Sequence, residues 1–592
     1  MCQVTLPHAP MKAEKQISRP STRRGRYVLT VVALGVLLLA FNHLSDYRIQ
    51  VVRKPSADDF QPKPKACSPP LPTLLTSKPP TLANPHIKTA AASLHALFAE
   101  RANAPDIDSL SAAVVTPRGL LFQGNYGVLR ANETTESRGV VTGDSIYRIA
   151  SITKMFTTLE TLILRERGYL NWDDPVTKFI PNFTNPSSGW AAHLSDTGKP
   201  AVDQAPVTLR QLASHLSGIG RDYPPYDVGA WPATLAKPDP SDEYDNRMNG
   251  SLDRLLHAVA HIPLVAPQYT FPIYSNTGFD LLGACNTVAY ELATGEPITH
   301  RELLQKDVFD PLNMTSSFYK IPNNRLAAQV AVPATDSEWA DLTYSNTFDP
   351  AGGQYSSLND LAMIMQTFLA PKNGGVVSPY VLREWLRPLH AWSDGFREVG
   401  APWEIKKISD SARIYSKGGN LPGYHSQFAL NPQWGYGVIV LVTGIYTDTE
   451  TLTRQAVERF QPAFELALLD EVRSAYTGIW FGNGSVALVT LDKGVLYLQT
   501  LLVGDQDVLG LLQRDPVAGS QPIALWTTGR PHEFRLAIGR PELNGNPDAG
   551  CEPYWLSFDW PTARGAPLDL IFWEHDELVY PSAGVRLRRA RE

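Results

Sequence analysis

The sequence predicts a protein of mixed α/β (α+β) class, with a large domain of helices and strands over residues 86–468 and a β-rich C-terminal domain over residues 469–592. Helical and strand-like apolar patterns alternate through the first range. After residue 470 the apolar residues recur mainly at the period of two that is typical of strands. With 592 residues, of which 43% are hydrophobic and 19% charged, the chain is long enough for two domains with apolar cores.

The N-terminal residues have a different composition. Residues 1–26 are basic and are expected to form a cytosolic tail, and residues 27–44 contain a long uncharged apolar run. This order predicts a transmembrane signal anchor, with the membrane as a partner and a single-pass protein whose catalytic domain is lumenal or extracellular. A cleaved signal peptide, and hence a secreted protein, is the alternative. Residues 45–85 are rich in proline and predict a linker, so the fold is expected to begin near residue 86.

Sequons for N-glycosylation follow the apolar run. An Asn-x-Ser/Thr sequence marks a surface asparagine that is glycosylated in a secreted protein. The sequence predicts a glycoprotein, and the candidate sites are Asn132, Asn182, Asn249, Asn313 and Asn483.

Composition excludes several classes of function. The net charge of -6 gives no basic stripe for a polyanion, so no nucleic-acid partner is expected. The four cysteines lack the close paired spacing of a zinc site, so no metal site is predicted. Cys285 lies in an apolar run and is expected to be a buried thiol. A disulfide between Cys67 and Cys551 is left open, and the oligomeric state is not predicted.

Ser151 and Lys154 are the candidate nucleophile and its basic partner. They lie in YRIASITKMFTTLETLILRERGYLNWDDPV, where apolar residues recur at helical spacing. Three residues along a helix is just under one turn, so the Lys154 amine reaches back toward the Ser151 hydroxyl. A serine needs a nearby base, and a lysine on an apolar helix face loses its proton more readily. Ser317 and Lys320 have the same spacing, but Pro322 follows them and no amphipathic helix begins there.

The segment YRIASITK resembles the nucleophile segment of serine beta-lactamases, penicillin-binding proteins and their esterase relatives. Further stretches match that family in the same order: VTLRQLASHLSGI at 207–219, PIYSNTGFDLLG at 272–283, DPLNMTSSFY at 310–319, PAGGQYSSLNDLA at 350–362 and SKGGNLPGY at 416–424. The resemblance implies a beta-lactamase/transpeptidase-like domain with an antiparallel sheet flanked by helices. The layout as a whole resembles fungal membrane-bound or secreted beta-lactamase-like proteins, some of whose relatives act in secondary metabolism.

The family's second motif is Tyr-x-Asn, and Tyr-Ser-Asn occurs twice, beginning at Tyr274 and at Tyr344. Tyr274 precedes an apolar helical pattern, as in the family, whereas Tyr344 precedes a loop. The resemblance therefore implies that Tyr274 moves protons between Ser151, Lys154 and the leaving group. Asn276 is expected to bind substrate and the lysine, with a structural turn asparagine as the alternative.

The third motif is normally Lys-Thr-Gly or a His-x-Gly variant, and this chain has Lys417-Gly418-Gly419. The Lys417 charge is expected to lower the pKa of Tyr274, and Gly419 to let substrate approach the strand. By resemblance, the backbone N–H of Asn420 joins that of the nucleophile in an oxyanion hole. The threonine missing at Gly418 predicts weak binding of a beta-lactam carboxylate. The predicted substrate-binding residues are Asn276, Gly418, Gly419 and Asn420.

Histidine and aromatic residues also lie near these motifs. His215 is expected to pack and hydrogen-bond rather than to act as a base. His425 follows the third motif, either lining the pocket or packing beneath it. Tyr223, Tyr226 and Trp231 precede the second motif, where they form either an acyl-pocket wall or ordinary loop contacts.

These observations predict a serine hydrolase that forms an acyl-enzyme on Ser151 with a small ester, lactone, thioester or amide substrate. No cofactor is expected. The alternatives are an acyltransferase of the same fold and a non-catalytic binding or scaffold module.

Overall fold

The computed structural model describes residues 67–187, 189–194, 205–223, 250–408, 412–513, 521–539, 550–559 and 561–590. One compact unit comprises Cys67–Asn544 and Cys551–Glu592. The predicted cytosolic tail at 1–26, the predicted anchor at 27–44 and residues 45–66 of the predicted linker lie outside the described residues.

The structure corrects the prediction of a transmembrane signal anchor. Within the described ranges, no helix is both long enough and apolar enough to cross a membrane. The two longest, α9 (Asn276–Thr294) and α15 (Thr449–Tyr476), carry acidic side chains and bury only part of their surface against neighbouring elements. The membrane partner and the single-pass membrane location, which rested on the anchor at 27–44, are withdrawn with it.

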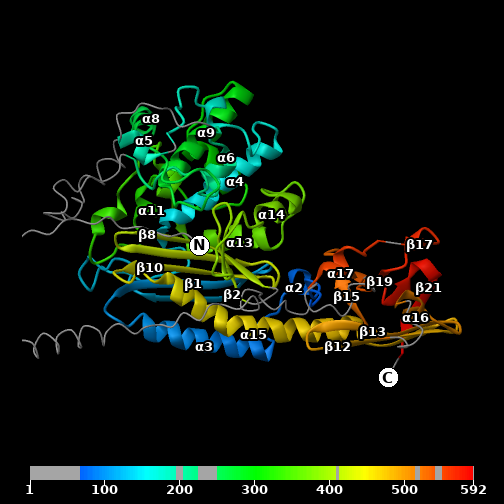
Figure 1. Ribbon diagram of the computed structural model, residues 1–592. Coiled ribbons are helices and arrows are strands. Elements are labelled where there is room, and N and C mark those ends of the chain that lie inside the picture. Colours follow the sequence, from blue (N-terminus) through cyan, green and yellow to red (C-terminus); the bar gives the residue numbers. More distant parts are fainter. Residues whose placement is uncertain are drawn as a thin grey trace, which may run out of the picture. The chain divides into compact units, whose positions relative to one another are not determined.

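An eight-stranded antiparallel sheet forms the centre of the large domain (Figure 1). Its strands follow the order β2-β1-β10-β9-β8-β7-β6-β5. Their bounds are β1 Ile107–Thr116, β2 Gly119–Gly127, β5 His390–Ala391, β6 Arg397–Val399, β7 Glu404–Lys407, β8 Arg413–Leu421, β9 Tyr424–Asn431 and β10 Tyr436–Gly444. This sheet confirms the expected antiparallel beta-lactamase/transpeptidase-like architecture.

Helices cover both faces of this sheet, and the apolar residues of β1 show how. Ala113 and Val115 join the apolar cluster on one face, and Ala112 and Val114 join the cluster on the other. Successive strand residues point to opposite faces, so a strand buried on both sides is apolar throughout. On the second face lie α3 (Pro85–Arg101) and α15 (Figure 1).

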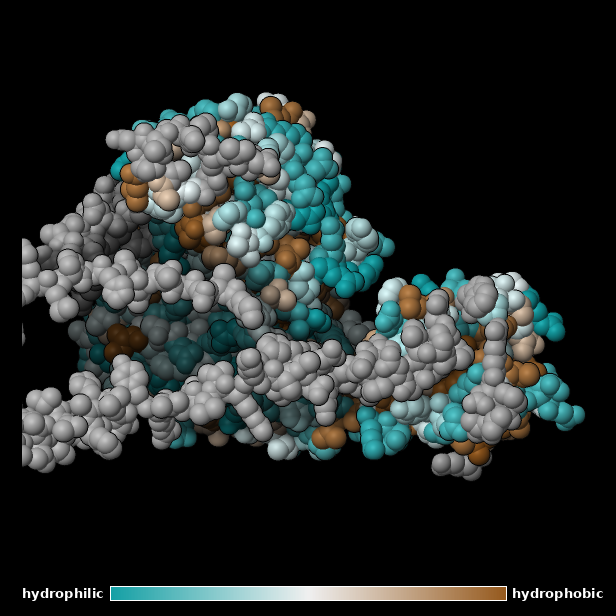
Figure 2. Space-filling view, in the orientation of Figure 1, coloured by the Kyte–Doolittle hydropathy of each residue, from teal (hydrophilic) through white to brown (hydrophobic). Residues whose placement is uncertain are grey.

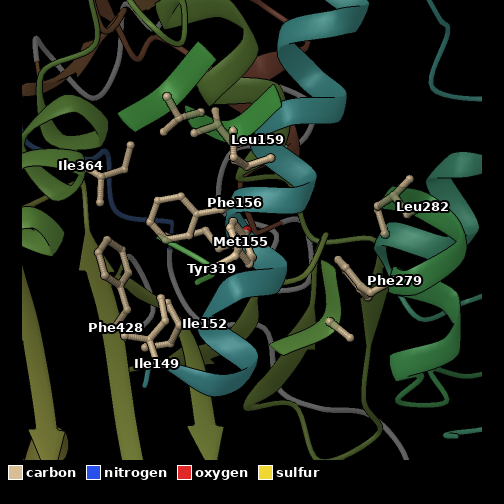
Figure 3. Packing of buried hydrophobic residues seen from close by; sticks show 14 of the residues in the cluster. Ile149, Ile152, Met155, Phe156, Leu159, Phe279, Leu282, Tyr319, Ile364 and Phe428 are labelled. Carbon is tan, nitrogen blue, oxygen red and sulfur yellow. The ribbon is translucent and has the colours of Figure 1, made fainter. Parts of the chain in front are cut away.

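The first face carries the helices that hold the candidate site. Helix α4 (Thr153–Glu166) and the turn η2 (Ala150–Ile152) before it pack between Phe428 of β9 and Phe279 of α9 (Figure 3). The side chains that do so are Ile152 of η2 and Met155, Phe156 and Leu159 of α4. The remaining elements of this layer are β3 Ile146–Arg148, η3 Val176–Lys178, α5 Trp190–Leu194, α6 Leu209–Ala213, α8 Leu252–His261, α10 His300–Leu304, η4 Gln305–Phe309, α11 Asn324–Ala327, η5 Ser337–Ala340, α12 Asp349–Gly352, β4 Tyr355–Ser357, α13 Leu358–Leu369 and α14 Pro379–Trp385.

The C-terminal strands form a second, nine-stranded sheet that the pairing of β12 with β13 closes into a barrel. This confirms the predicted β-rich C-terminal domain. The elements are β11 Gly478–Gly482, β12 Ser485–Asp492, β13 Val495–Val503, β14 Gln506–Asp507, α16 Val508–Gln513, β15 Ile523–Thr527, β16 Glu533–Leu536, α17 Glu552–Trp555, β17 Thr562–Ala563, β18 Ala566–Pro567, β19 Leu570–Glu574, β20 Glu577–Tyr580, η6 Pro581–Ala583 and β21 Val585–Arg589.

Apolar side chains also occur on the outside of this barrel. The strand register places Phe481 opposite Val486, and Val486 opposite Leu502, and all three side chains are exposed. Figure 2 shows hydrophobic residues among hydrophilic ones on the C-terminal domain. The apolar pattern of β11 to β13 therefore exceeds what the barrel interior requires.

Residues 67–84, which the sequence analysis assigned to the linker, pack against the folded domains. Helix α2 (Leu74–Ser77) buries Leu74 and Leu75 in the same apolar cluster as α3 and α15. The Asn84 side chain accepts hydrogen bonds from the first backbone N–H groups of α3 and caps that helix. A disulfide joins Cys67 to Cys551, the pairing that the sequence left open. The high proline content predicted a linker, and the segment gave no periodic apolar pattern that would have indicated packing, because it contains little regular structure.

A truncated chain that begins at residue 86 should be less stable than one that begins at residue 67. Deletion of 67–85 removes two buried leucines, the Asn84 cap and the disulfide. Burial of a leucine contributes about 1.5–3 kcal/mol and an N-cap about 1 kcal/mol, so we expect a loss of at least about 3 kcal/mol in denaturant unfolding. Cys67→Ser with Cys551→Ser in the longer chain measures the disulfide's share. Equal unfolding free energies for the two chains would contradict this account.

Candidate active site

The turn that carries Ser151 lies between β3 and α4. Ala150, the residue before it, has a φ of 47° and is buried. This left-handed conformation is unfavourable for a residue with a side chain and marks a turn that its surroundings hold in place. The Ser426 hydroxyl donates to the Ile149 carbonyl at 2.9 Å and ties the turn to β9. As a result, the Ser151 side chain remains partly exposed at the start of a buried helix.

Lys154 is buried and donates to three acceptors from three parts of the chain. Its Nζ lies 3.1 Å from Ser151 Oγ, 2.7 Å from Asn276 Oδ1 and 2.6 Å from the Ala351 carbonyl oxygen. Burial, assisted by the positive charge of Lys417, lowers the pKa of Lys154, although Tyr274 opposes the shift. These contacts bring the predicted nucleophile, lysine and Asn276 together.

Tyr274 precedes α9 and is held by its neighbours. Ser275 caps the helix by accepting from Gly278 N–H, and its hydroxyl donates to the Gly220 carbonyl. The His215 ring stacks on the tyrosine, with 4.6 Å between centroids and 27° between planes. The Ser275 N–H donates to His215 Nδ1 at 3.1 Å, so the neutral ring carries its proton on Nε2.

Cations surround the phenol ring of Tyr274. The Lys154 and Lys417 Nζ atoms lie 5.0 and 5.1 Å from its centroid, and the Arg221 Cζ atom lies 5.0 Å away. Burial alone would raise the pKa of Tyr274, but the two lysines outweigh burial and lower this pKa to about 8. Glu404 acts against them and a hydrogen bond with Ser151 acts with them. The tyrosine therefore gives up its proton at a lower pH than an ordinary phenol, whose pKa is about 10.

The third motif lies on β8, where Lys417 forms an ion pair with Glu404 of β7. The Lys417 Nζ lies 2.6 Å from Glu404 Oε1 and also donates to the Gly418 carbonyl at 2.8 Å. The second oxygen, Oε2, accepts from Gly418 N–H at 3.1 Å. Burial would lower the pKa of Lys417, but Glu404 and Tyr274 raise it, so this side chain stays charged.

Gly419 lies directly against the nucleophile turn. A Cβ at this position would lie 2.3 Å from the Ile149 carbonyl oxygen and 2.9 Å from the Ser151 nitrogen. Only glycine fits, and the strand backbone approaches the backbone N–H of the serine. The Gly418 N–H points to the β7 side of β8, and N–H directions alternate along a strand. The Asn420 N–H therefore points to the same side, as an oxyanion donor paired with Ser151 requires.

Several alternatives from the sequence lie away from this cluster. Tyr344 is buried, with the Arg148 guanidinium over its ring. Ser317 is buried and donates to Asp360, and Lys320 is exposed. Tyr223 is buried in the apolar core and its hydroxyl accepts from Gly220 N–H, so it serves as a loop contact. Tyr226 and Trp231 lie outside the described residues.

The two histidines near the motifs are structural. Burial, followed by the charges of Lys154, Lys417 and Arg221, holds the pKa of His215 well below its usual range, so the ring stays neutral. His425 on β9 contacts the Asn420 side chain at 2.7 Å and the Gly444 carbonyl at 3.2 Å. It fixes the side chain of Asn420 rather than lining a pocket.

Three residues of the cluster were not identified from the sequence. Glu404 pairs with Lys417, Asp222 accepts from the Asn276 amide at 2.7 Å, and Arg221 lies over Tyr274. Each belongs to a segment without a motif. The only available signal was position, since Arg221 and Asp222 directly follow the second matched stretch, which ends at residue 219.

The Beta-lactamase family model matches residues 94–460, which contain every one of these residues. The chain belongs to the beta-lactamase family. Among curated relatives, the beta-lactamase-like proteins str6 and str5 of Strobilurus tenacellus are 33% and 38% identical over 50% and 38% of this chain, and over 99% and 81% of their own lengths. Putative beta-lactamase-like 1 of Homo sapiens is 26% identical over 65% of this chain and 71% of its own.

The beta-lactamase family fold also matches a solved structure. A beta-lactamase/D-alanine carboxypeptidase from Yersinia pestis aligns with a TM-score of 0.50 and 20% identity, covering 64% of this chain and 98% of that one. The likeness shows the fold. It agrees with the beta-lactamase/transpeptidase-like architecture that the motifs predicted.

The glycosylation sites remain predictions. The described sequon asparagines Asn132, Asn182, Asn313 and Asn483 are exposed, and Asn249 lies outside the described residues. Asn313 and Asn483 occupy turns with φ of 55° and 49°. Exposure in a turn leaves these side chains accessible to a modifying enzyme.

Gly419→Ala should reduce ester turnover by at least about a hundredfold, because its methyl group would displace the nucleophile turn, and a displacement of about 1 Å costs on that order. Gly418→Ala is the matched control. Its Cβ would meet the Gln427 Oε1 atom at 2.8 Å, the end of a side chain that can move aside. Steady-state kinetics with thermal melts would check both variants. Wild-type kcat/KM in Gly419→Ala would contradict this geometry.

Proposed function

We propose that the protein is a serine hydrolase that forms an acyl-enzyme on Ser151 with ester, lactone, thioester or amide substrates. The contact that carries the proposal is the 3.1 Å approach of Lys154 Nζ to Ser151 Oγ, beside a tyrosine whose pKa is lowered to about 8. A serine with a base and a charged partner within hydrogen-bond reach is the arrangement that nucleophilic catalysis needs.

Tyr274 is the proposed base. Asn276 Oδ1 and the Ala351 carbonyl oxygen can only accept, so Lys154 donates to both, and its remaining contact is with Ser151 Oγ. In its charged form the amine donates to the serine as well and has no lone pair with which to take a proton. It therefore polarises the serine oxygen, while the Tyr274 phenolate takes the hydroxyl proton. The Ser151 oxygen then attacks the substrate carbonyl carbon, and the carbonyl oxygen becomes an oxyanion.

The backbone N–H groups of Ser151 and Asn420 would hold that oxyanion. Collapse of the tetrahedral intermediate breaks the bond to the leaving group, which takes the proton from Tyr274. The tyrosine, again a phenolate, then removes a proton from water, whose oxygen attacks the acyl carbon. Collapse of this second intermediate breaks the bond to the Ser151 oxygen, which takes the proton back from Tyr274, and the acid is released. Transfer to another alcohol or amine in place of water would give an acyltransferase, which remains the second candidate.

A non-catalytic scaffold is the alternative from another class. The lowered pKa of Tyr274 and the close approach of Gly419 to the serine favour catalysis, because a scaffold has no need for either. A source of substrates in secondary metabolism remains a prediction.

A fluorophosphonate probe tests the proposal directly. It should label wild-type protein at Ser151, as located by mass spectrometry of the labelled peptide, and should not label Ser151→Ala. Failure to label a folded wild-type protein, together with no hydrolysis of short aryl esters, would overturn the proposal.

Lys154→Ala and Tyr274→Phe should each lower kcat/KM for a short aryl ester by at least about a hundredfold, the usual order for a positioned proton-transfer group. Tyr344→Phe is the matched control, because its ring packs over Arg148 in the core. It should keep most of the activity. Near-normal kcat/KM in Tyr274→Phe, together with a loss of activity in Tyr344→Phe, would assign the role of base to Tyr344 instead of Tyr274.

The rate of acylation should depend on pH through Tyr274. Because the base is the phenolate, kcat/KM should rise as pH increases through about 8 and level off above it. Lys417→Ala removes a cation that lowers the pKa of Tyr274, so this limb should move to higher pH. Stopped-flow acylation with an aryl ester would measure the profile. If the rise of kcat/KM with pH occurs at the same pH in Lys417→Ala as in wild type, Tyr274 is not the base.

A further inference from the structure

The positive charge of the third motif is already paired. The Lys417 ammonium is buried, 2.6 Å from the Glu404 carboxylate, and the Glu404 side chain itself is 45% exposed. Of the two partners, it is therefore the carboxylate that a substrate can reach. An arriving anion meets Glu404 before it meets Lys417.

Glu404 also occupies a defined place on the strand edge. Its Oε2 accepts from Gly418 N–H, and β7 pairs with β8 only as far as Ser416. The edge of β8 from Gly418 to Asn420 continues past the end of that pairing. At roughly 3.4 Å per residue, the carboxylate lies about 7 Å along the edge from the N–H proposed to hold the oxyanion.

A second carboxylate, Asp222, contacts residues of the same cluster. Asp222, which is 44% exposed, accepts from the Asn276 amide and lies 3.4 Å from the Arg221 guanidinium. Both the lysine of the third motif and the arginine over the tyrosine therefore have an acidic partner. Each pairing offsets the positive charge of Lys417 or of Arg221, so these two cations attract an anionic substrate less strongly.

We propose that Glu404 determines which charge a substrate can carry near its reacting carbonyl. The site accepts acyl substrates that are uncharged or cationic near the reacting carbonyl and disfavours those that carry a carboxylate there. This inference rests on the proposed hydrolase function and deepens it. Repulsion between two carboxylates acts over about 8 Å at physiological salt and weakens as salt is added. This repulsion adds to the effect of Gly418, where the absence of a threonine already predicts weak binding of a substrate carboxylate.

Three acetate esters that differ in one substituent test the proposal: 3-acetoxybenzoate, its methyl ester, and 3-acetoxy-N,N,N-trimethylanilinium. Glu404→Gln keeps the shape and hydrogen-bond capacity of the side chain but removes its charge. In this variant, kcat/KM for the anionic ester should rise at least about fivefold relative to the neutral ester, and that for the cationic ester should fall by a similar factor. In 1 M salt the wild-type ratios should approach those of Glu404→Gln, because salt screens the charge that the variant lacks.

Glu384→Gln is the matched control. Glu384 pairs with Arg165 and is 36% exposed, so the variant removes the same charge from an ion pair of similar exposure outside the cluster. It should leave both ratios, anionic to neutral and cationic to neutral, unchanged. If it changes them as much as Glu404→Gln does, the net charge of the protein is responsible and the proposal fails.

The pH dependence of kcat/KM tests whether Glu404 acts through its charge, because a purely structural role would leave this dependence unchanged. The charged and titratable groups that face Tyr274 are Lys154 of α4, Lys417 of β8, Glu404 of β7, Arg221, and the stacked His215. Glu404 raises the pKa of Tyr274, so Glu404→Gln should move the rising limb for the neutral ester to lower pH.

The outcomes separate the two proposals. If wild-type protein hydrolyses the neutral ester in a Ser151-dependent way but the charge ratios do not change in Glu404→Gln, the substrate-charge proposal is overturned and the hydrolase function stands. If the neutral ester is not hydrolysed and Ser151 takes no fluorophosphonate, both are overturned.

Discussion

The burial of the Lys154 amine is the constraint on which the rest of the site depends. A buried ammonium is costly unless several acceptors surround it, and its three acceptors come from the nucleophile turn, from α9 and from the segment before β4. The acceptors on α9 and before β4 lie 122 and 197 residues from Lys154 in the chain. Satisfying one amine therefore fixes the mutual position of Ser151, Asn276 and the Ala351 carbonyl, which is the arrangement that acyl transfer requires.

Close backbone contact provides the second constraint. The turn before Ser151 holds Ala150 at positive φ, and Ser426 and Gly419 lie directly against the adjoining Ile149 carbonyl. The strain of the turn is balanced by this contact with the central sheet. Because the sheet is buried on both faces, β8 and β9 cannot shift without disturbing both apolar clusters. The core thus holds the backbone groups that would stabilise an oxyanion.

The sequence predicted the elements with local signatures. The helix after Ser151, the antiparallel sheet and the C-terminal β-domain follow from periodicity and motif order, and Tyr274 was separated from Tyr344 by the helix that follows it. The membrane anchor was predicted from a basic tail followed by an apolar run, and no helix of the described residues is long and apolar enough to cross a membrane. The packing of residues 67–84 was missed because two leucines in a proline-rich segment produce no period. Pairings across the fold, such as Cys67 with Cys551, depend on tertiary position rather than on spacing.

The electrostatic balance of the site is the part furthest from local sequence. Lys417 alone predicts a cationic site and a low pKa for Tyr274, whereas the structure adds a carboxylate on the neighbouring strand that opposes both effects. Glu404 lies thirteen residues before its partner, with no motif to mark it. The register of β7 with β8 alone brings the two together, since it pairs Glu404 with Ser416, one residue from the lysine. The charge that a substrate meets is thus a property of strand pairing, and a relative with the same Lys-Gly-Gly but another residue at this place on β7 would present a different charge to the same nucleophile.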